Sequence, residues 1–322
     1  MPSRSQPSGG ATTSSNKAVS AGQQRARGAG RGAPARQVTR RRRSIQWGAA
    51  AAIVLAIAGT IVTIRSNDEA ADGAGWPRVG GDLHSLIAIG DALYVAGHDA
   101  AAVSRDGGRQ WQQIKSLNGS DAMGWALTAD AVLAGGHPGL YRSTDGAATF
   151  AKVTGVGDVP DAHGLGGFKN VVYLASPQAG LMASTDGGNS WEARNTQIGR
   201  TIMGTILVDP ADPDRLIAPD MSQGLVTSTD AGRTWKLLGG PPAAIAAAWN
   251  PTDVRQIVAI GMNGSAFSGD GGVTWQQVNV PSGTRALTFD TAGHTLYAAA
   301  LDGDEARVFR TTDRGTTWTP TA

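Results

Sequence analysis

Cysteine is absent from this 322-residue chain, so no disulfide bond can stabilise its fold. Glutamate is scarce: Glu69 lies in an expected linker, Glu192 on an expected outer strand and Glu305 in a late hairpin. No acidic residue precedes Asp68, and the only long uncharged apolar run covers residues 45–64. These absences exclude a disulfide-stabilised domain and leave few glutamates for carboxylate catalysis.

A short motif, Ser/Thr-x-Asp-x-Gly-x-x-Trp/Phe, occurs six times after residue 100. The copies cover residues 104–111, 143–150, 184–191, 228–235, 268–275 and 311–318. Their aspartates are Asp106, Asp145, Asp186, Asp230, Asp270 and Asp313, and their aromatic residues are Trp111, Phe150, Trp191, Trp235, Trp275 and Trp318. Successive aspartates are 39, 41, 44, 40 and 43 residues apart, which is the length of one four-stranded propeller blade. The repeat therefore predicts an all-β, six-bladed β-propeller.

Each copy of the motif lies between two strand-like segments and reads as a β-hairpin. At the turn, the aspartate can accept backbone N–H hydrogen bonds while the glycines adopt positive φ values. The aromatic residue is expected to pack between neighbouring blades. Ala147 in the second copy and Arg314 in the sixth stand at turn positions that are glycine in most other copies. These two turns are therefore expected to be strained or loosely packed.

These motifs resemble Asp boxes, or BNR repeats, of sialidases, the sortilin family and photosystem II assembly factors of the Ycf48 and HCF136 type. The resemblance implies that the six aspartates and their aromatic partners are structural and do not catalyse. Three further segments resemble exported bacterial Asp-box proteins labelled glycosyl hydrolases. They are Asp121-Ala122-Met123-Gly124-Trp125, Gly136-His137-Pro138-Gly139-Leu140 and Asp161-Ala162-His163-Gly164-Leu165.

Four regions are expected along the chain. Residues 1–44 form a disordered basic cytoplasmic tail, 45–64 a transmembrane helix, 65–82 a linker and 83–322 the propeller. The four consecutive arginines at 40–43 place the N-terminus in the cytoplasm and the propeller outside a bacterial cell membrane. The alternative is secretion after cleavage of a signal peptide near Ala56-Ile57-Ala58, but the preceding basic region is longer than signal peptides carry.

Charge is distributed unevenly between the tail and the propeller. After Arg65 the chain has 17 Lys and Arg against 26 Asp and Glu, a net charge of −9. Nucleic-acid binding by the propeller is therefore not expected, whereas the basic tail can lie on anionic inner-leaflet lipid. Because six blades fit between residues 83 and 319, no strand shared between the termini is obvious, and residues 76–79 are the candidates for closing the ring.

A sialidase would need an Arg-Ile-Pro element, three substrate-binding arginines and a tyrosine with a glutamate partner. The chain has no Arg-Ile-Pro, and none of its glutamates is well placed beside a tyrosine. Asp82, Asp121 and Asp161 are candidates for the carboxylate pair of another glycosidase, although aspartate is also a common turn residue.

One position of the innermost strands forms a column of side chains. Aligning the blades places His84, Met123, His163, Met203, Ile245 and Arg285 at equivalent positions, 39 to 42 residues apart. His98 and His137, at the ends of second strands, are expected at the same mouth of the channel. Imidazole and thioether together suit copper, especially Cu(I), so the candidate metal ligands are His84, His163, Met123, Met203, His98 and His137. The alternative is that Met packs the core and His caps strand ends.

The sequence thus favours a membrane-anchored, extracytoplasmic propeller that acts as a binding or assembly scaffold without its own catalysis. Its expected partners are the membrane and a protein, with a glycan as an alternative ligand. Two other functions are kept open: a sialidase-like or glycosidase-like enzyme or glycan-binding protein, and a copper-binding protein. No cofactor is certain from the sequence, and the candidates are copper or another metal ion.

Overall fold

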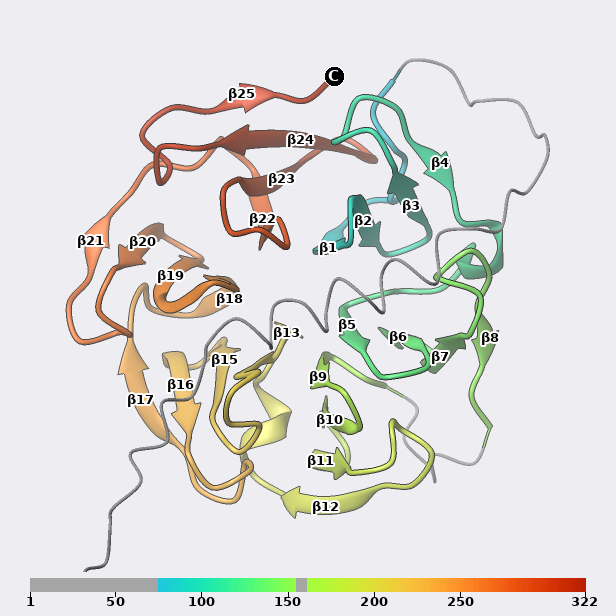
Figure 1. The fold of residues 1–322 in the computed structure, drawn as a ribbon, viewed down its shortest axis with the longest axis vertical. Coiled ribbons are helices and arrows are strands. Elements are labelled where there is room, and N and C mark those ends of the chain that lie inside the picture. The colour runs from blue at the N-terminus through green and yellow to red at the C-terminus, as the bar shows by residue number, and fades with distance from the viewer. Residues whose placement is uncertain (1–74, 155–160) are drawn as a thin grey trace, which may run out of the picture. The chain divides into compact units, whose positions relative to one another are not determined.

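The computed structural model describes residues 75–154 and 161–322. Within them, 25 strands form six sheets arranged in a ring (Figure 1), and each sheet contains four antiparallel strands that are consecutive in the chain. The predicted all-β, six-bladed propeller is therefore confirmed. The predicted tail and transmembrane segment at residues 1–64 lie outside the described residues. No helix in the described part of the chain has the length and apolar character to span a membrane.

Each blade has four strands, numbered outward from the channel. Blade 1 comprises β1 (Leu83–Ile89), β2 (Ala92–Gly97), β3 (Ala101–Ser104) and β4 (Gln112–Gln113). Blade 2 comprises β5 (Gly124–Leu127), β6 (Val132–Gly136), β7 (Gly139–Ser143) and β8 (Ala151–Lys152). Blade 3 comprises β9 (Gly164–Phe168), β10 (Val171–Ser176), β11 (Gly180–Ser184) and β12 (Glu192–Asn195). Blade 4 comprises β14 (Leu207–Val208), β15 (Leu216–Asp220), β16 (Gly224–Ser228) and β17 (Lys236–Gly239). Blade 5 comprises β18 (Ala244–Asn250), β19 (Asp253–Gly261), β20 (Gly264–Ser268) and β21 (Gln276–Gln277). Blade 6 comprises β22 (Thr284–Phe289), β23 (Leu296–Asp302), β24 (Glu305–Thr311) and β25 (Thr319–Pro320).

The start of blade 4 departs from this regular plan. Before β14, the short strand β13 (Gly204–Thr205) pairs in parallel with β9 of blade 3, through Gly204 opposite Gly164. Two 3₁₀ turns, η1 (Lys115–Leu117) and η2 (Ile198–Arg200), lie in the connections that lead from blade 1 to blade 2 and from blade 3 to blade 4. Met203 consequently precedes a strand that joins two blades.

The hydrophobic core consists of six clusters, one between each pair of neighbouring blades. Each cluster contains the aromatic residue of one Asp box: Trp111, Phe150, Trp191, Trp235, Trp275 or Trp318. The expected packing of these rings between blades is confirmed. Because every blade interface repeats this arrangement, the aromatic rings hold the ring of blades together by burying large apolar surfaces.

The ring closes through a short segment that precedes blade 1. Val79 N–H donates to the carbonyl of Asp304 at 2.9 Å, and Ala306 N–H donates to the carbonyl of Pro77 at 2.9 Å. The Trp76 ring stacks against Phe309 of β24, with 6.5 Å between ring centroids. Residues 76–79 thus attach the N-terminal side of the propeller to its last blade, as the sequence suggested, without contributing a full strand.

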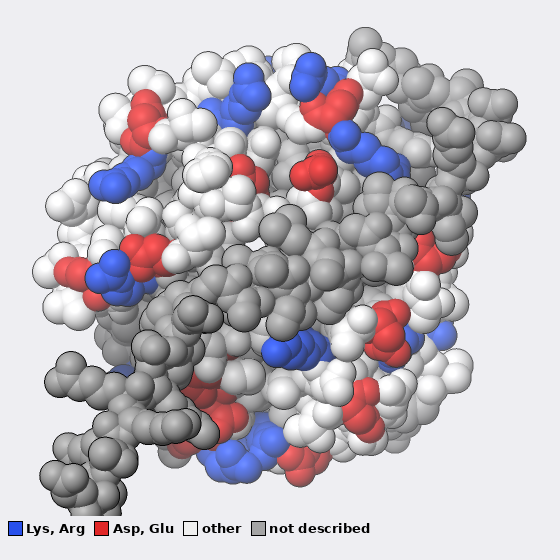
Figure 2. Space-filling model, viewed as in Figure 1, with Lys and Arg blue, Asp and Glu red and all other residues white. Residues whose placement is uncertain are grey.

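Charged side chains of both signs are interspersed over the face viewed in Figure 2. Ion pairs among the described residues include Arg215 with Asp209 at 2.8 Å and Arg255 with Asp253 at 2.8 Å. The excess of acidic residues is therefore spread around the propeller in that view rather than gathered into one acidic patch.

Candidate functional site

The antiparallel pairing of the first two strands brings two sets of side chains to one channel mouth. In blade 1, His98 N–H donates to the carbonyl of Asp82 at 3.2 Å, so the residue after β2 lies beside the residue before β1. In blade 2, Asp121 N–H donates to the carbonyl of His137 at 2.9 Å. The start of each first strand and the end of each second strand therefore meet at the same end of the channel, as predicted.

His84, His98 and Asp121 form the first cluster. His98 Nδ1 approaches Asp121 Oδ1 at 3.1 Å without hydrogen-bond geometry, and His84 Nε2 lies 3.6 Å from the same oxygen. The Asp121 side chain is only 3% exposed. Neither Asp121 Oδ1 nor His84 Nε2 has a hydrogen-bond partner among the described residues. A buried carboxylate oxygen without a partner is costly, because its hydration has been lost and not replaced.

His137, Asp161 and His163 form the second cluster. His137 Nδ1 and Asp161 Oδ1 are 2.5 Å apart, and the Gln178 amide donates to the other Asp161 oxygen at 2.7 Å. His163 Nε2 lies 3.1 Å from His137 Nε2, and the two rings pack edge to face. When Asp161 is ionised and the His137 ring is neutral, His137 donates from Nδ1, which leaves the lone pair of its Nε2 directed at His163.

The environment of this second cluster favours a neutral imidazole beside an ionised carboxylate. Burial lowers the pKa of His163, and repulsion from His137 lowers it further. Burial alone would raise the pKa of Asp161, but hydrogen bonds from Gln178 and His137 outweigh it and lower the pKa. A neutral His163 keeps a nitrogen lone pair that a metal ion can use.

The distances between the imidazole nitrogens and carboxylate oxygens of the two clusters are similar to those between ligand atoms on one metal ion. Ligands on a tetrahedral ion at 2.0–2.1 Å lie roughly 3.3 Å apart. The distances of 3.1 Å between His137 and His163, and of 3.1 and 3.6 Å from His98 and His84 to Asp121, are close to that value. Asp121 Oδ2 also lies 4.0 Å from His137 Nε2, so this carboxylate faces both clusters. We call these six residues, His84, His98, Asp121, His137, Asp161 and His163, the mouth cluster.

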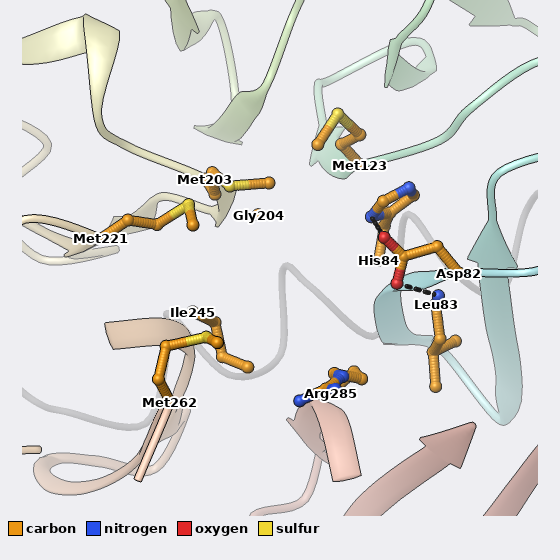
Figure 3. A pocket seen from close by; sticks show the side chains of 10 residues that line it. All are labelled: Asp82, Leu83, His84, Met123, Met203, Gly204, Met221, Ile245, Met262 and Arg285. Carbon is orange, nitrogen blue, oxygen red and sulfur yellow. Dashed lines mark hydrogen bonds and ion pairs between the residues drawn. The ribbon is translucent and has the colours of Figure 1, made fainter. Parts of the chain in front are cut away.

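A cavity of about 220 Å³ adjoins the mouth cluster. Five of the six residues in the predicted column line it: His84, Met123, Met203, Ile245 and Arg285. His163 is the exception, since it packs against His137 instead. Figure 3 shows Met203 and Met221 together on one side of the cavity, with Met123 and His84 across from them.

Besides Leu83 and Gly204, sequence reasoning missed two lining methionines, Met221 and Met262. They follow the second strands of blades 4 and 5, the place that His98 and His137 occupy in blades 1 and 2. A second column, aligned on the ends of the second strands, would have revealed them.

The Asp boxes lie at the turn between the third and fourth strands, away from the channel. In the third box, Asp186 Oδ1 accepts from the backbone N–H groups of Asn189 and Ser190 at 3.0 and 2.8 Å. The Trp191 indole donates to the carbonyl of Gly188 at 3.2 Å. The first, fourth and fifth boxes repeat this indole bond, whereas Trp318 donates to Asn279 of the neighbouring blade.

Positive φ values occur where two boxes lack glycine, as expected: 63° at Ala147 and 61° at Arg314. Ala231 in the fourth box, at 59°, adds a third strained position.

Comparison with known proteins agrees with this architecture. No family model matches the chain. A xyloglucanase of Hypocrea jecorina (strain QM6a) is 31% identical over 208 residues, which are 56% of this chain and 22% of that protein. The chain thus spans about a fifth of the length of this curated relative.

Two solved structures illustrate the likeness of fold. The structure of YCF48 bound to D1 peptide has a TM-score of 0.51 at 16% identity, covering 80% of this chain and 88% of that chain. The Niastella koreensis GH74 enzyme has a TM-score of 0.48 at 16% identity, covering 74% of this chain and 46% of that chain. The chain is a six-bladed β-propeller with six copies of the aspartate motif.

Several described residues that a glycosidase could use make other contacts, whereas Asp121 Oδ1 has no hydrogen-bond partner among the described residues. Glu192 pairs with Arg194 on the outer strand β12 at 2.5 Å. The Tyr173 hydroxyl donates to the carbonyl of Pro213 at 3.1 Å, and burial raises its pKa to about 12. Asp161 has a lowered pKa, the opposite of what a general acid requires.

Proposed function

We propose that this Asp-box propeller is anchored in the membrane, faces the extracytoplasmic side, and binds its ligands without catalysing a reaction. We propose further that one ligand is a copper ion at the mouth cluster. The observation that carries this proposal is the buried Asp121, whose unpartnered Oδ1 faces His84 and His98. The uncharged segment 45–64 after four arginines supports the anchor.

Copper is favoured by the donor set of the mouth cluster. Four imidazoles and two carboxylates suit borderline metal ions, and among divalent first-row ions such sites bind Cu²⁺ most tightly. Asp161 would hold His137 in the tautomer that presents Nε2 to the ion, as carboxylates commonly do for metal-bound histidines. The ion would in turn be a positively charged partner for the buried Asp121 carboxylate, whose Oδ1 has no hydrogen-bond partner among the described residues.

A protein partner is part of the proposed scaffold role. The solved structure of YCF48 contains a D1 peptide, and we propose a protein ligand of unspecified sequence for this propeller by analogy. Glycan handling is the competing function, and the partial identity with a xyloglucanase favours it. These alternatives are separated by incubation of the purified chain with xyloglucan, for which we expect no release of reducing sugar.

Metal binding is tested with the full-length chain in detergent, by isothermal titration with Cu²⁺ and by metal analysis after dialysis. The test variant carries His84→Gln and His163→Gln, one histidine from each half of the mouth cluster, and its matched control carries His294→Gln, an exposed histidine in blade 6 outside the cluster. We expect the double variant to bind Cu²⁺ at least about tenfold more weakly, while the control binds like the unmodified chain. Equal affinity of the double variant and the control would refute the mouth cluster as a metal site.

A further inference from the structure

The channel mouth is chemically divided between its blades. In blades 1 to 3, the residue two positions before the column residue is Asp82, Asp121 or Asp161. In blades 4 and 5 the equivalent residues are Thr201 and Ala243, and they accept backbone hydrogen bonds from Met221 and Met262 at 3.0 and 3.1 Å. Carboxylate and imidazole on one side are thus replaced by thioether on the other.

Four methionines converge on the cavity beside the mouth cluster. Met123, Met203, Met221 and Met262 all line it, and they are four of the six methionines in the chain. Figure 3 shows their side chains directed toward the cavity from blades 2, 4 and 5. Met221 and Met262 are 42% and 56% exposed. Ordinary packing accounts for a buried methionine such as Met123, but not for exposed ones gathered around a channel.

We propose that these four residues, which we call the thioether wall, form a second site that binds Cu(I). Thioethers are soft, neutral donors that select Cu(I) over harder divalent ions. The backbones of Met203 and Met221 lie side by side, because Met203 N–H donates to the carbonyl of Pro219 and Met221 N–H donates to that of Thr201.

Charged side chains of both signs line the cavity. Arg285 of blade 6 and Asp82 of blade 1 oppose each other in charge, so the thioether donors, not a net charge, select the ion. The site extends the proposed copper binding to the reduced ion. It rests on methionines rather than on the mouth cluster, so either site can fail without the other.

The test measures Cu(I) affinity without oxygen, by competition with a chromogenic Cu(I) chelator, using the full-length chain in detergent. The test variant carries Met203→Leu, Met221→Leu and Met262→Leu. The matched control is Met182→Leu, a half-buried methionine on β11 outside the cavity. Leucine keeps the volume and apolar character of methionine, so folding is expected to survive, and thermal unfolding checks it. The exposed single variants Met221→Leu and Met262→Leu serve if the triple variant is unstable.

We expect the triple variant to bind Cu(I) at least about tenfold more weakly while its Cu²⁺ affinity stays within about twofold, and Met182→Leu to change neither. Unchanged Cu(I) affinity in the triple variant overturns the thioether wall as a site. A parallel loss of Cu(I) and Cu²⁺ overturns it as a separate site. Methionine-dependent Cu(I) binding in a chain that binds no Cu²⁺ would support the thioether wall and refute the proposed function of the mouth cluster.

Discussion

At the scale of single residues, the hydroxyl that opens each Asp box has a central role. Ser184 is 1% exposed, accepts the N–H of Gly188 at 2.8 Å and donates to Asp186 Oδ1 at 2.7 Å. The same pair of bonds is made by the hydroxyls of Ser104, Ser143, Ser228, Ser268 and Thr311. One buried hydroxyl thus orients the aspartate and satisfies a buried N–H group.

Replacing this hydroxyl should destabilise the propeller. Ser184→Ala leaves the Gly188 N–H buried without its acceptor, and we expect a loss of about 1–3 kcal/mol in the free energy of unfolding. Denaturant unfolding followed by circular dichroism measures it. The control is Ser282→Ala at an exposed position, which should change stability by less than about 0.5 kcal/mol. Equal stability of the two variants would mean that the hydroxyl does not support the turn.

At the scale of structural elements, the segment 76–79 decides whether blades 1 and 6 stay joined. Val79 is fully buried in the cluster between these blades, where it packs with residues of both. Because the strands of residues 75–154 and 161–322 include none that exchanges between the termini, this interface depends on side-chain packing and the few backbone bonds of the segment.

Truncating Val79 should therefore weaken the closure of the ring. Val79→Ala removes two buried carbon atoms and leaves a cavity, and we expect a loss of about 2 kcal/mol in unfolding free energy. The matched control is Val273→Ala, since Val273 is 80% exposed and should contribute almost nothing. Thermal unfolding of both variants measures the difference, and a Val79→Ala midpoint equal to the control's would contradict the role of the segment.

At the scale of the whole molecule, the six Asp boxes couple the fold to pH. Hydrogen bonds from side-chain hydroxyls and backbone N–H groups lower the pKa values of Asp230, Asp270 and Asp313 to about 2. The pKa values of Asp106, Asp145 and Asp186 are lowered as well. The folded state therefore holds these carboxylates ionised at a pH where the unfolded chain, with aspartate pKa values of about 3.9, takes up protons.

Stability should consequently fall at acid pH. The contribution of the boxes is complete above about pH 5 and is lost as the pH decreases from about 4 toward 2, because protonation then favours the unfolded chain. Urea unfolding at intervals from pH 6 to pH 2 measures this dependence. In Asp270→Asn the dependence should be shallower than in the unmodified chain. A slope that is the same for both would argue against the box carboxylates as its source.

Part of the candidate site could be predicted from residue spacing. The Asp-box period specified the blades, and the first column placed His84, Met123 and Met203 at one cavity. The second column consists of residues that follow the second strands of the blades. Aligning it requires the lengths and register of those strands, so Met221 and Met262 were missed. The contact between His137 and Asp161 crosses from blade 2 to blade 3, and the sequence of either blade alone does not contain it.

The sequence alone determined the number of blades, the aromatic packing between them and the structural role of the boxes, because each depends on contacts within one repeat or between adjacent ones. Tertiary structure alone decided which side chains meet at the channel. It buried Asp121 between two histidine clusters and brought Met221 and Met262 to the cavity that Met123 and Met203 line. Those contacts depend on how six blades rotate around a common axis, and residue spacing carries no information about that rotation.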